Sequence, residues 1–169
     1  VERDIEDFFL SLNLARPEAA RDALLAYLPE LIRAHGLVAA SVAADWYDEL
    51  RAQDGIPGRF RATVIEPKDV DEKVAATVRR AAAHLFTPTP GLMMPALIDP
   101  ATKYALEPGR DTIAEASIRD PRARGWKRYT RPGSCDFCQM LSTRTYSNRT
   151  DHFDAHGHCH CVAAPVWGN

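Results

Sequence analysis

The fold of the C-terminal region is decided by Cys135-Asp136-Phe137-Cys138 and, after 17 intervening residues, by His156-Gly157-His158-Cys159-His160-Cys161. A two-residue gap between cysteines lets both sulfurs reach one ion, and zinc prefers four sulfur or imidazole ligands in a tetrahedron. All four cysteines of the chain lie within these two segments. The pattern therefore predicts a small module folded around one zinc ion.

Five side chains compete for the four places around such an ion: Cys135, Cys138, His156, Cys159 and Cys161. His158 and His160 are weaker candidates because residues beside a ligand generally point away from the metal, and His152 is expected to be solvated. Which of the five is left out is open at this point. Disulfide pairing is the alternative that an exported or virion-exposed protein would allow.

The surplus of soft ligands predicts a closed, structural zinc site, because a catalytic zinc keeps one position free for water. No residue is predicted to be catalytic. The histidines upstream of Cys135 lack the glutamate of the nucleobase-deaminase signature. Neither a G-x-S-x-G motif nor a phosphate-binding glycine loop occurs.

Upstream of this cluster, apolar residues recur every three or four positions, which is typical of helices. Pro29 is expected to kink or split one of these helices, since a mid-helix proline costs about 3 kcal/mol, and Gly36 is expected to end it. The segment 121–133 is expected to be loop or extended. Helices are predicted over residues 2–12, 17–34, 37–51, 70–86 and 109–119, with a short strand or extended segment at 60–65.

The predicted fold class is mainly α, with a helical N-terminal body and a small zinc-stapled C-terminal α+β module. The composition, 46% hydrophobic and 26% charged, is that of a globular protein, and no stretch is expected to span a membrane. Pro88, Pro90 and Gly91 mark a break. The expected divisions are a helical body over 1–87, a linker and connecting helix over 88–118, and the zinc-binding module over 119–169.

A basic segment precedes the first cysteine pair: six cations and one acid lie between Arg119 and Arg131, with Trp126 and Tyr129 among them. Cations interleaved with aromatic rings are typical of grooves that follow a phosphate backbone, although a protein partner or a solvated face is commoner. The candidate contacts for DNA or a partner are Arg122, Arg124, Lys127, Arg128 and Arg131.

Six segments carry a resemblance to a known family, namely 133–141, 156–161, 165–166, 44–51, 109–112 and 119–121. With these segments, the chain resembles the MuF-like minor head proteins of tailed bacteriophages, especially those of actinobacterial hosts. The resemblance covers most of the chain, and it departs at Ser142-Thr143-Arg144-Thr145-Tyr146, where relatives usually have a glycine in a tight turn.

This resemblance implies a structural virion protein, packaged in few copies at the portal vertex or in the head interior and present in the host cytoplasm during assembly. Its implied partners are the phage portal protein, the major capsid protein, or both, together with packaged DNA; neither a membrane nor a small-molecule substrate is implied. Some relatives are fused to a capsid maturation protease. A protease or a DNA-acting effector enzyme packaged in the head is therefore the alternative function.

Overall fold

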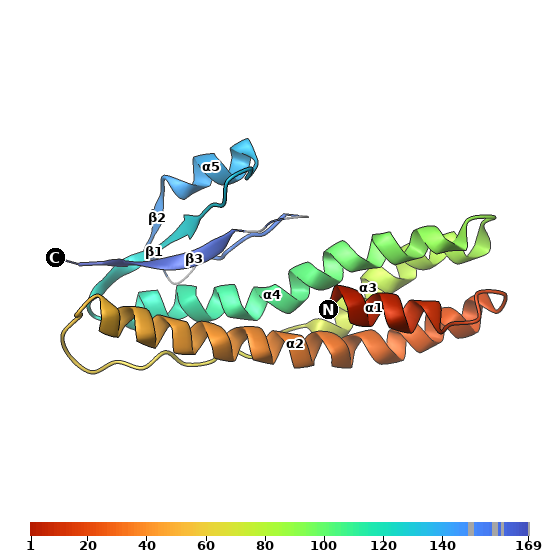
Figure 1. Ribbon diagram of the computed structural model, residues 1–169, viewed down its shortest axis with the longest axis horizontal. Coiled ribbons are helices and arrows are strands. Elements are labelled where there is room, and N and C mark those ends of the chain that lie inside the picture. The colour runs from red at the N-terminus through yellow and green to blue at the C-terminus, as the bar shows by residue number, and fades with distance from the viewer. Residues whose placement is uncertain (149–150, 157–158, 160, 169) are drawn as a thin grey trace.

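The computed structural model describes residues 1–148, 151–156, 159 and 161–168. The protein is mainly α-helical and carries a small antiparallel sheet near its C-terminus, which confirms the predicted fold class (Figure 1). The elements, in chain order, are α1 (Glu2–Leu10), α2 (Pro17–Gln53), α3 (Val70–Ala81), the 3₁₀ helices η1 (Ala82–Phe86) and η2 (Pro90–Leu92), α4 (Met93–Arg119), β1 (Ala123–Tyr129), α5 (Asp136–Ser142), β2 (Thr145–Tyr146) and β3 (Val162–Trp167).

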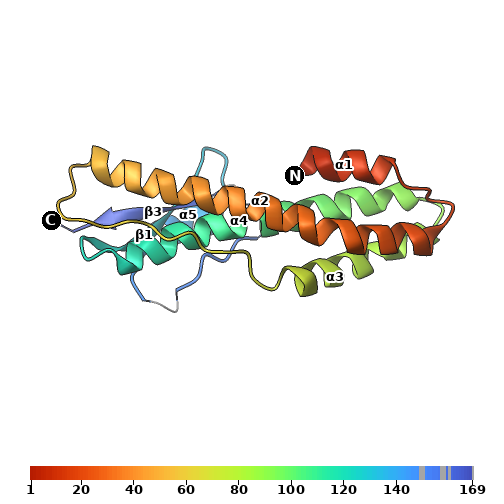
Figure 2. The ribbon, with the colours of Figure 1, turned by 90° about the horizontal axis from the view of Figure 1, so that it is seen from below.

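Two long helices, α2 and α4, lie side by side and form the spine of the molecule (Figures 1 and 2). The predicted stop at Gly36 is wrong, and α2 is not split at Pro29, because it runs through both residues as one helix of 37 residues. A Cβ atom on Gly36 would lie 2.7 Å from Cγ of Pro67. Gly36 therefore permits the close approach of the segment that leads to α3, and it does not end the helix.

Packing explains why α2 continues past its proline. Leu24, Leu28 and Ile32 of α2 are buried against α1, α3 and the first half of α4, and Tyr47 is buried in a second cluster farther along. Each such side chain contributes about 1.5–3 kcal/mol when buried. Burial at both ends of the helix thus outweighs the cost of about 3 kcal/mol for an interior proline.

Most of the segment expected to be a linker and connecting helix is α4, a core element. It also contains two prolines, Pro100 and Pro108, without ending at either. Both α2 and α4 contribute to the helical cluster and to the cluster that surrounds the cysteines. The zinc-binding module expected over 119–169 is consequently packed on the helices, and the exact domain limits stay a prediction.

By length and composition alone, α2 could cross a membrane, although the sequence analysis expected no such stretch. One third of its most apolar window is buried within the protein, and the core helix of a soluble protein passes the same test. This single feature is weak support for a membrane span.

The sheet has the strand order β2-β1-β3, and both pairings are antiparallel. Its central strand, β1, lies in the segment expected to be loop or extended, whereas residues 60–65 form no strand. Both β1 and β3 contact α4. The sheet therefore covers one half of α4, while α1 and α3 pack toward the other half (Figure 1).

Gly125 is required where β1 meets β2. Its φ is +131°, and a Cβ atom there would lie 2.1 Å from the carbonyl oxygen of Tyr146. We expect Gly125→Ala to separate these strands and to lower the free energy of unfolding by about 3 kcal/mol or more, measured by urea denaturation. Gly133→Ala is the matched control, since Gly133 also has a positive φ but open space around it. Equal losses in the two variants would contradict this account.

Candidate metal centre

The five predicted ligands come together between α5 and the segment that leads into β3. Cys135 is the N-cap residue of α5 and Cys138 lies in its first turn, while Cys161 directly precedes β3. The potential ligand atoms form two groups, and within each group they all lie within 4.8 Å of one another. The first group is Cys135, Cys138 and His156, and the second is Cys138, Cys159 and Cys161, so Cys138 belongs to both. This cluster could hold a metal ion.

The separation of two of the sulfurs fits a tetrahedral zinc site, whereas Nε2 of His156 lies closer to two sulfurs than the about 3.6 Å of an ideal site. Sulfurs that each lie about 2.3 Å from one zinc ion are about 3.8 Å apart, and Sγ of Cys138 lies 3.9 Å from Sγ of Cys159. Nε2 of His156 lies 3.2 Å from Sγ of Cys135 and 3.0 Å from Sγ of Cys138. All four cysteines are free, and a disulfide needs sulfurs about 2.05 Å apart. The four cysteines therefore form a cluster of free thiols, and the disulfide pairing considered as the alternative is not present among these four described residues.

The thiols differ in burial and in acidity. Cys138, Cys159 and Cys161 are buried, whereas Cys135 is exposed. The backbone N–H of Cys138 lowers the pKa of the Cys135 thiol. Burial raises the pKa of Cys138 to about 12. A metal ion bound by Cys138 would have to displace this thiol proton, so binding at neutral pH would release it.

Cys159 has a lowered pKa although it is buried. Burial acts to raise the pKa of its thiol, but the backbone N–H of Cys161, the positive charge of Arg110 and hydrogen bonds with the thiols of Cys138 and Cys161 all lower it, and their combined effect is larger. Cys135 and Cys159 thus both have thiols of lowered pKa, and each accepts a hydrogen bond from a backbone N–H of its own segment.

Two arginines that the sequence analysis did not connect with the cysteines adjoin the cluster. Nη1 of Arg128 lies 3.6 Å from Sγ of Cys159 and 4.0 Å from Sγ of Cys138, and its Nη2 donates to the carbonyl of Asp154 at 2.7 Å. Arg110 donates from Nε to the carbonyl of Cys161 at 3.2 Å and from Nη2 to that of Cys159 at 2.7 Å. Strand alternation could have revealed Arg128, because it shares a face of β1 with the apolar Trp126.

The expected basic surface is smaller than the sequence suggested. Placing Arg128 on it was wrong, since this side chain is 2% exposed and its guanidinium lies over the Phe153 ring. Trp126 is fully buried and stacks on Tyr146, so it offers no face to a nucleic-acid base. Of the remaining candidate contacts, Arg122, Arg124 and Arg131 are exposed and Lys127 is partly buried.

Of the other histidines in this region, His152 is exposed, as expected. His158 and His160, the weaker ligand candidates, lie outside the described residues.

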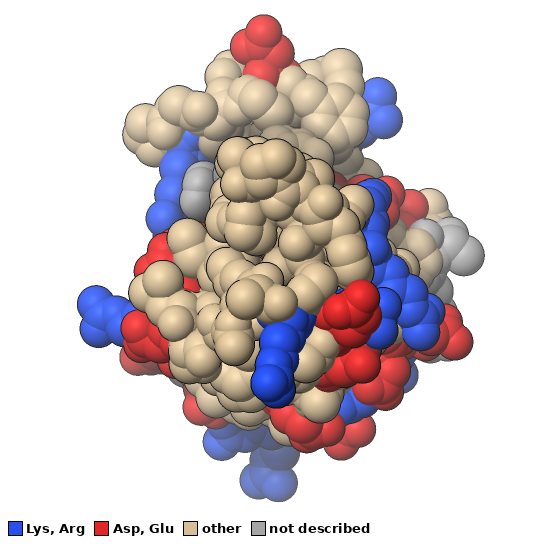
Figure 3. Space-filling model, turned by 90° about the vertical axis from the view of Figure 1, so that its right-hand side faces the viewer, with Lys and Arg blue, Asp and Glu red and all other residues tan. Residues whose placement is uncertain are grey.

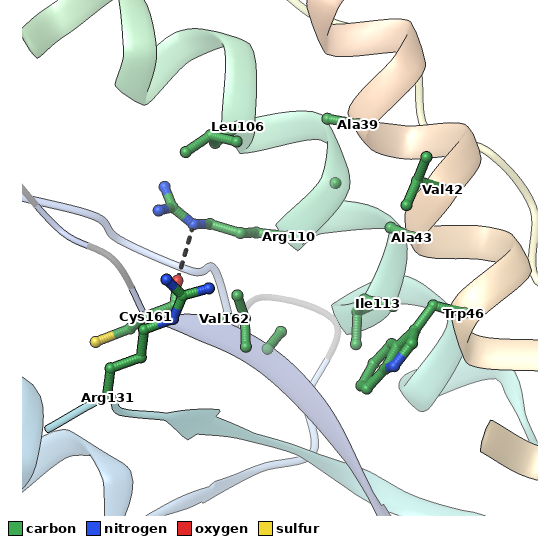
Figure 4. A pocket seen from close by; sticks show the side chains of 12 residues that line it. Ala39, Val42, Ala43, Trp46, Leu106, Arg110, Ile113, Arg131, Cys161 and Val162 are labelled. Carbon is green, nitrogen blue, oxygen red and sulfur yellow. Dashed lines mark hydrogen bonds between the residues drawn. The ribbon is translucent and has the colours of Figure 1, made fainter.

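An apolar pocket of about 660 Å³ lies between α2, α4 and the start of β3 (Figure 4). Val42 and Trp46 of α2 and Val162 of β3 line it, and each is partly or largely exposed. The charged residues among its lining are Arg110 and Arg131, which both extend toward Cys161. The pocket therefore adjoins the ligand cluster and offers an apolar surface edged by positive charge.

A second uncharged surface lies at one end of the molecule, where α1 ends and α4 begins. Figure 3 looks onto that end, and uncharged residues fill the centre of the view. α1, η1 and η2 end there on exposed apolar side chains, namely Leu10, Phe86 and Leu92. The molecule thus presents apolar surface at this end and also at the pocket along α2 and α4.

Comparison with known proteins gives one family. No curated protein and no solved structure matches the chain. The model of the family described as VG15 protein matches residues 1–169, and this name suggests a phage-encoded gene product. Since the match spans every residue, the chain belongs to the VG15 protein family.

Proposed function

We propose that this protein is a structural minor head protein of a tailed bacteriophage, of the MuF-like kind, and that a zinc ion stabilises its C-terminal module. The observation that carries the proposal is the convergence of Cys135, Cys138, His156, Cys159 and Cys161 in a chain that matches a phage-type family over its whole length. The proposed location is the portal vertex or the interior of the head.

The donor set favours zinc in a structural role. Thiolate sulfur and imidazole nitrogen are the ligands that zinc uses in closed four-coordinate sites, whereas hard ions such as magnesium prefer oxygen. Five candidate ligands exceed the four places, so no position need stay open for water. When bound, zinc would supply folding free energy to the module and no reaction step.

An interaction role is supported by the surface of the molecule. Exposed apolar surface that lines a pocket is typical of contact sites for other molecules. The proposed partners are the portal protein, the major capsid protein, or both. Packaged DNA is a further proposed contact, through the exposed Arg122, Arg124 and Arg131.

The test uses purified virions of the phage that encodes the chain. We expect mass spectrometry to find the protein in the heads at few copies relative to the major capsid protein, and elemental analysis of protein prepared without chelator to find about one zinc ion per chain. Absence from virions would overturn the location, and absence of metal would overturn the zinc centre. Cleavage of capsid precursor or DNA by the purified protein would instead favour the enzyme alternative.

A further inference from the structure

Two positive charges are buried beside the ligand cluster. Arg128 is 2% exposed and Arg110 is 6% exposed. Both guanidinium groups also face the Phe153 ring, at 3.9 Å and 5.2 Å from its centre. An arginine stays protonated in proteins, and burying a charge without a partner is costly, so each of these side chains needs negative charge nearby.

No carboxylate forms a salt bridge with either arginine in the part of the chain that the structure describes, although the negative charge of Glu107 acts on Arg110 from a longer distance. The hydrogen bonds of Arg110 and Arg128 go to backbone carbonyls and to sulfur, and neither residue forms a salt bridge there. Nη1 of Arg110 and Nε of Arg128 are buried without a hydrogen-bond partner among the described residues. Both guanidinium groups instead contact the cysteine cluster.

We propose that Arg110 and Arg128 are the built-in counter-charges of an anionic, thiolate-rich metal centre. The inference rests on the proposed metal site and deepens it by fixing the class of its ligand set. A divalent ion with two thiolates and two neutral ligands has no net charge, and it would leave both guanidinium groups uncompensated. Three thiolates with His156 leave a net charge of minus one, and four thiolates leave minus two, which balances both arginines.

The two arginines contact different parts of the ligand cluster. Arg128 points its Nη1 at the sulfurs of Cys159 and Cys138, so it acts on the ligand atoms directly. Arg110 reaches from α4 and holds the carbonyls of Cys159 and Cys161, as the dashed bond to Cys161 in Figure 4 shows. Both arginines thereby favour a metal centre that carries negative charge over a neutral one.

The experiment measures zinc affinity of the full chain by competition with a chelator. We expect Arg128→Met to weaken zinc binding about 10- to 100-fold, the range found when outer partners of metal ligands are removed. Arg124→Met is the matched control, because Arg124 lies on the same strand but is exposed. Equal affinities in Arg128→Met and Arg124→Met would overturn the proposal.

Arg128→Lys separates charge from hydrogen-bond geometry, since lysine keeps the charge and loses the planar fork. Retention of most of the affinity supports the proposal, and a loss equal to that of Arg128→Met overturns it. X-ray absorption on the zinc-loaded wild type gives a readout that needs no variant: three or four sulfur ligands support an anionic centre, and two overturn it. Wild-type protein that binds no zinc would instead refute the metal site itself.

Discussion

Cys138→Ser is expected to release zinc and to unfold the C-terminal module. Cys138 is buried, and it is the one residue that belongs to both groups of potential ligands, the group with Cys135 and His156 and the group with Cys159 and Cys161. Zinc binding to small modules contributes on the order of 10 kcal/mol to folding. A serine oxygen is a poor substitute for a thiolate, so most of that free energy should be lost.

The unfolding should be confined to part of the molecule. Trp126, Phe153 and Ala163 pack in the same cluster as the cysteines, whereas the helical cluster around Leu24 and Leu28 contains none of them. Hydrogen exchange should therefore show lost protection in β1, β3 and α5, with protection kept in α1 and α3. Met140→Ser, at an exposed position of the same short helix, is the control. A Cys138→Ser protein with full zinc content and unchanged protection would refute the structural role.

Spacing predicted the ligand cluster because the coordination demands of a metal ion are local and specific. The two ligand segments are separated by 17 residues, yet their residue types predicted a shared site before any fold was known. The helices α1 and α3 were predicted for a similar reason, since each buries a stripe of regularly spaced side chains. The sequence thus predicted those features that depend on the spacing of residues close together in the chain.

Other features depend on packing that no local pattern contains. The unbroken course of α2 through Pro29 depends on burial along both of its halves. The position of Arg128 depends on strand β1, whose residues the sequence analysis interpreted as a basic surface segment. In that strand Arg124 is exposed whereas Trp126 and Arg128 are buried, because the register shifts between Ala123 and Gly125 and the later residues pack toward α4 and the cysteines.

A buried ion pair joins the helices to the sheet, and no sequence pattern predicted it. Nε of Arg51, at the end of α2, lies 2.7 Å from Oδ2 of Asp120, which also accepts from the Tyr47 hydroxyl at 3.3 Å. Burial and the negative charge of Asp120 both raise the pKa of that hydroxyl, so Tyr47 remains a neutral donor. Oδ1 of Asp120 accepts from the backbone N–H of Arg122 at 2.9 Å, at the turn into β1.

Asp120→Asn is expected to lower the free energy of unfolding by about 3–5 kcal/mol, measured by urea denaturation with tryptophan fluorescence. The substitution keeps the shape of the side chain but leaves the guanidinium of Arg51 buried, at 7% exposure, without its anion. Carbonyls of residues 56–58 also depend on that guanidinium, so the loop after α2 should loosen together with the turn into β1.

Glu115→Gln is the matched control for Asp120→Asn. Glu115 forms an ion pair with Arg119 on the surface of α4, in the last turns before Asp120. Surface pairs contribute about 0–1 kcal/mol, so this substitution should have little effect. If Asp120→Asn cost no more than Glu115→Gln, the buried pair would not hold the sheet to the helices. If the expected difference is found, the Arg51–Asp120 ion pair holds the start of β1 to the end of α2.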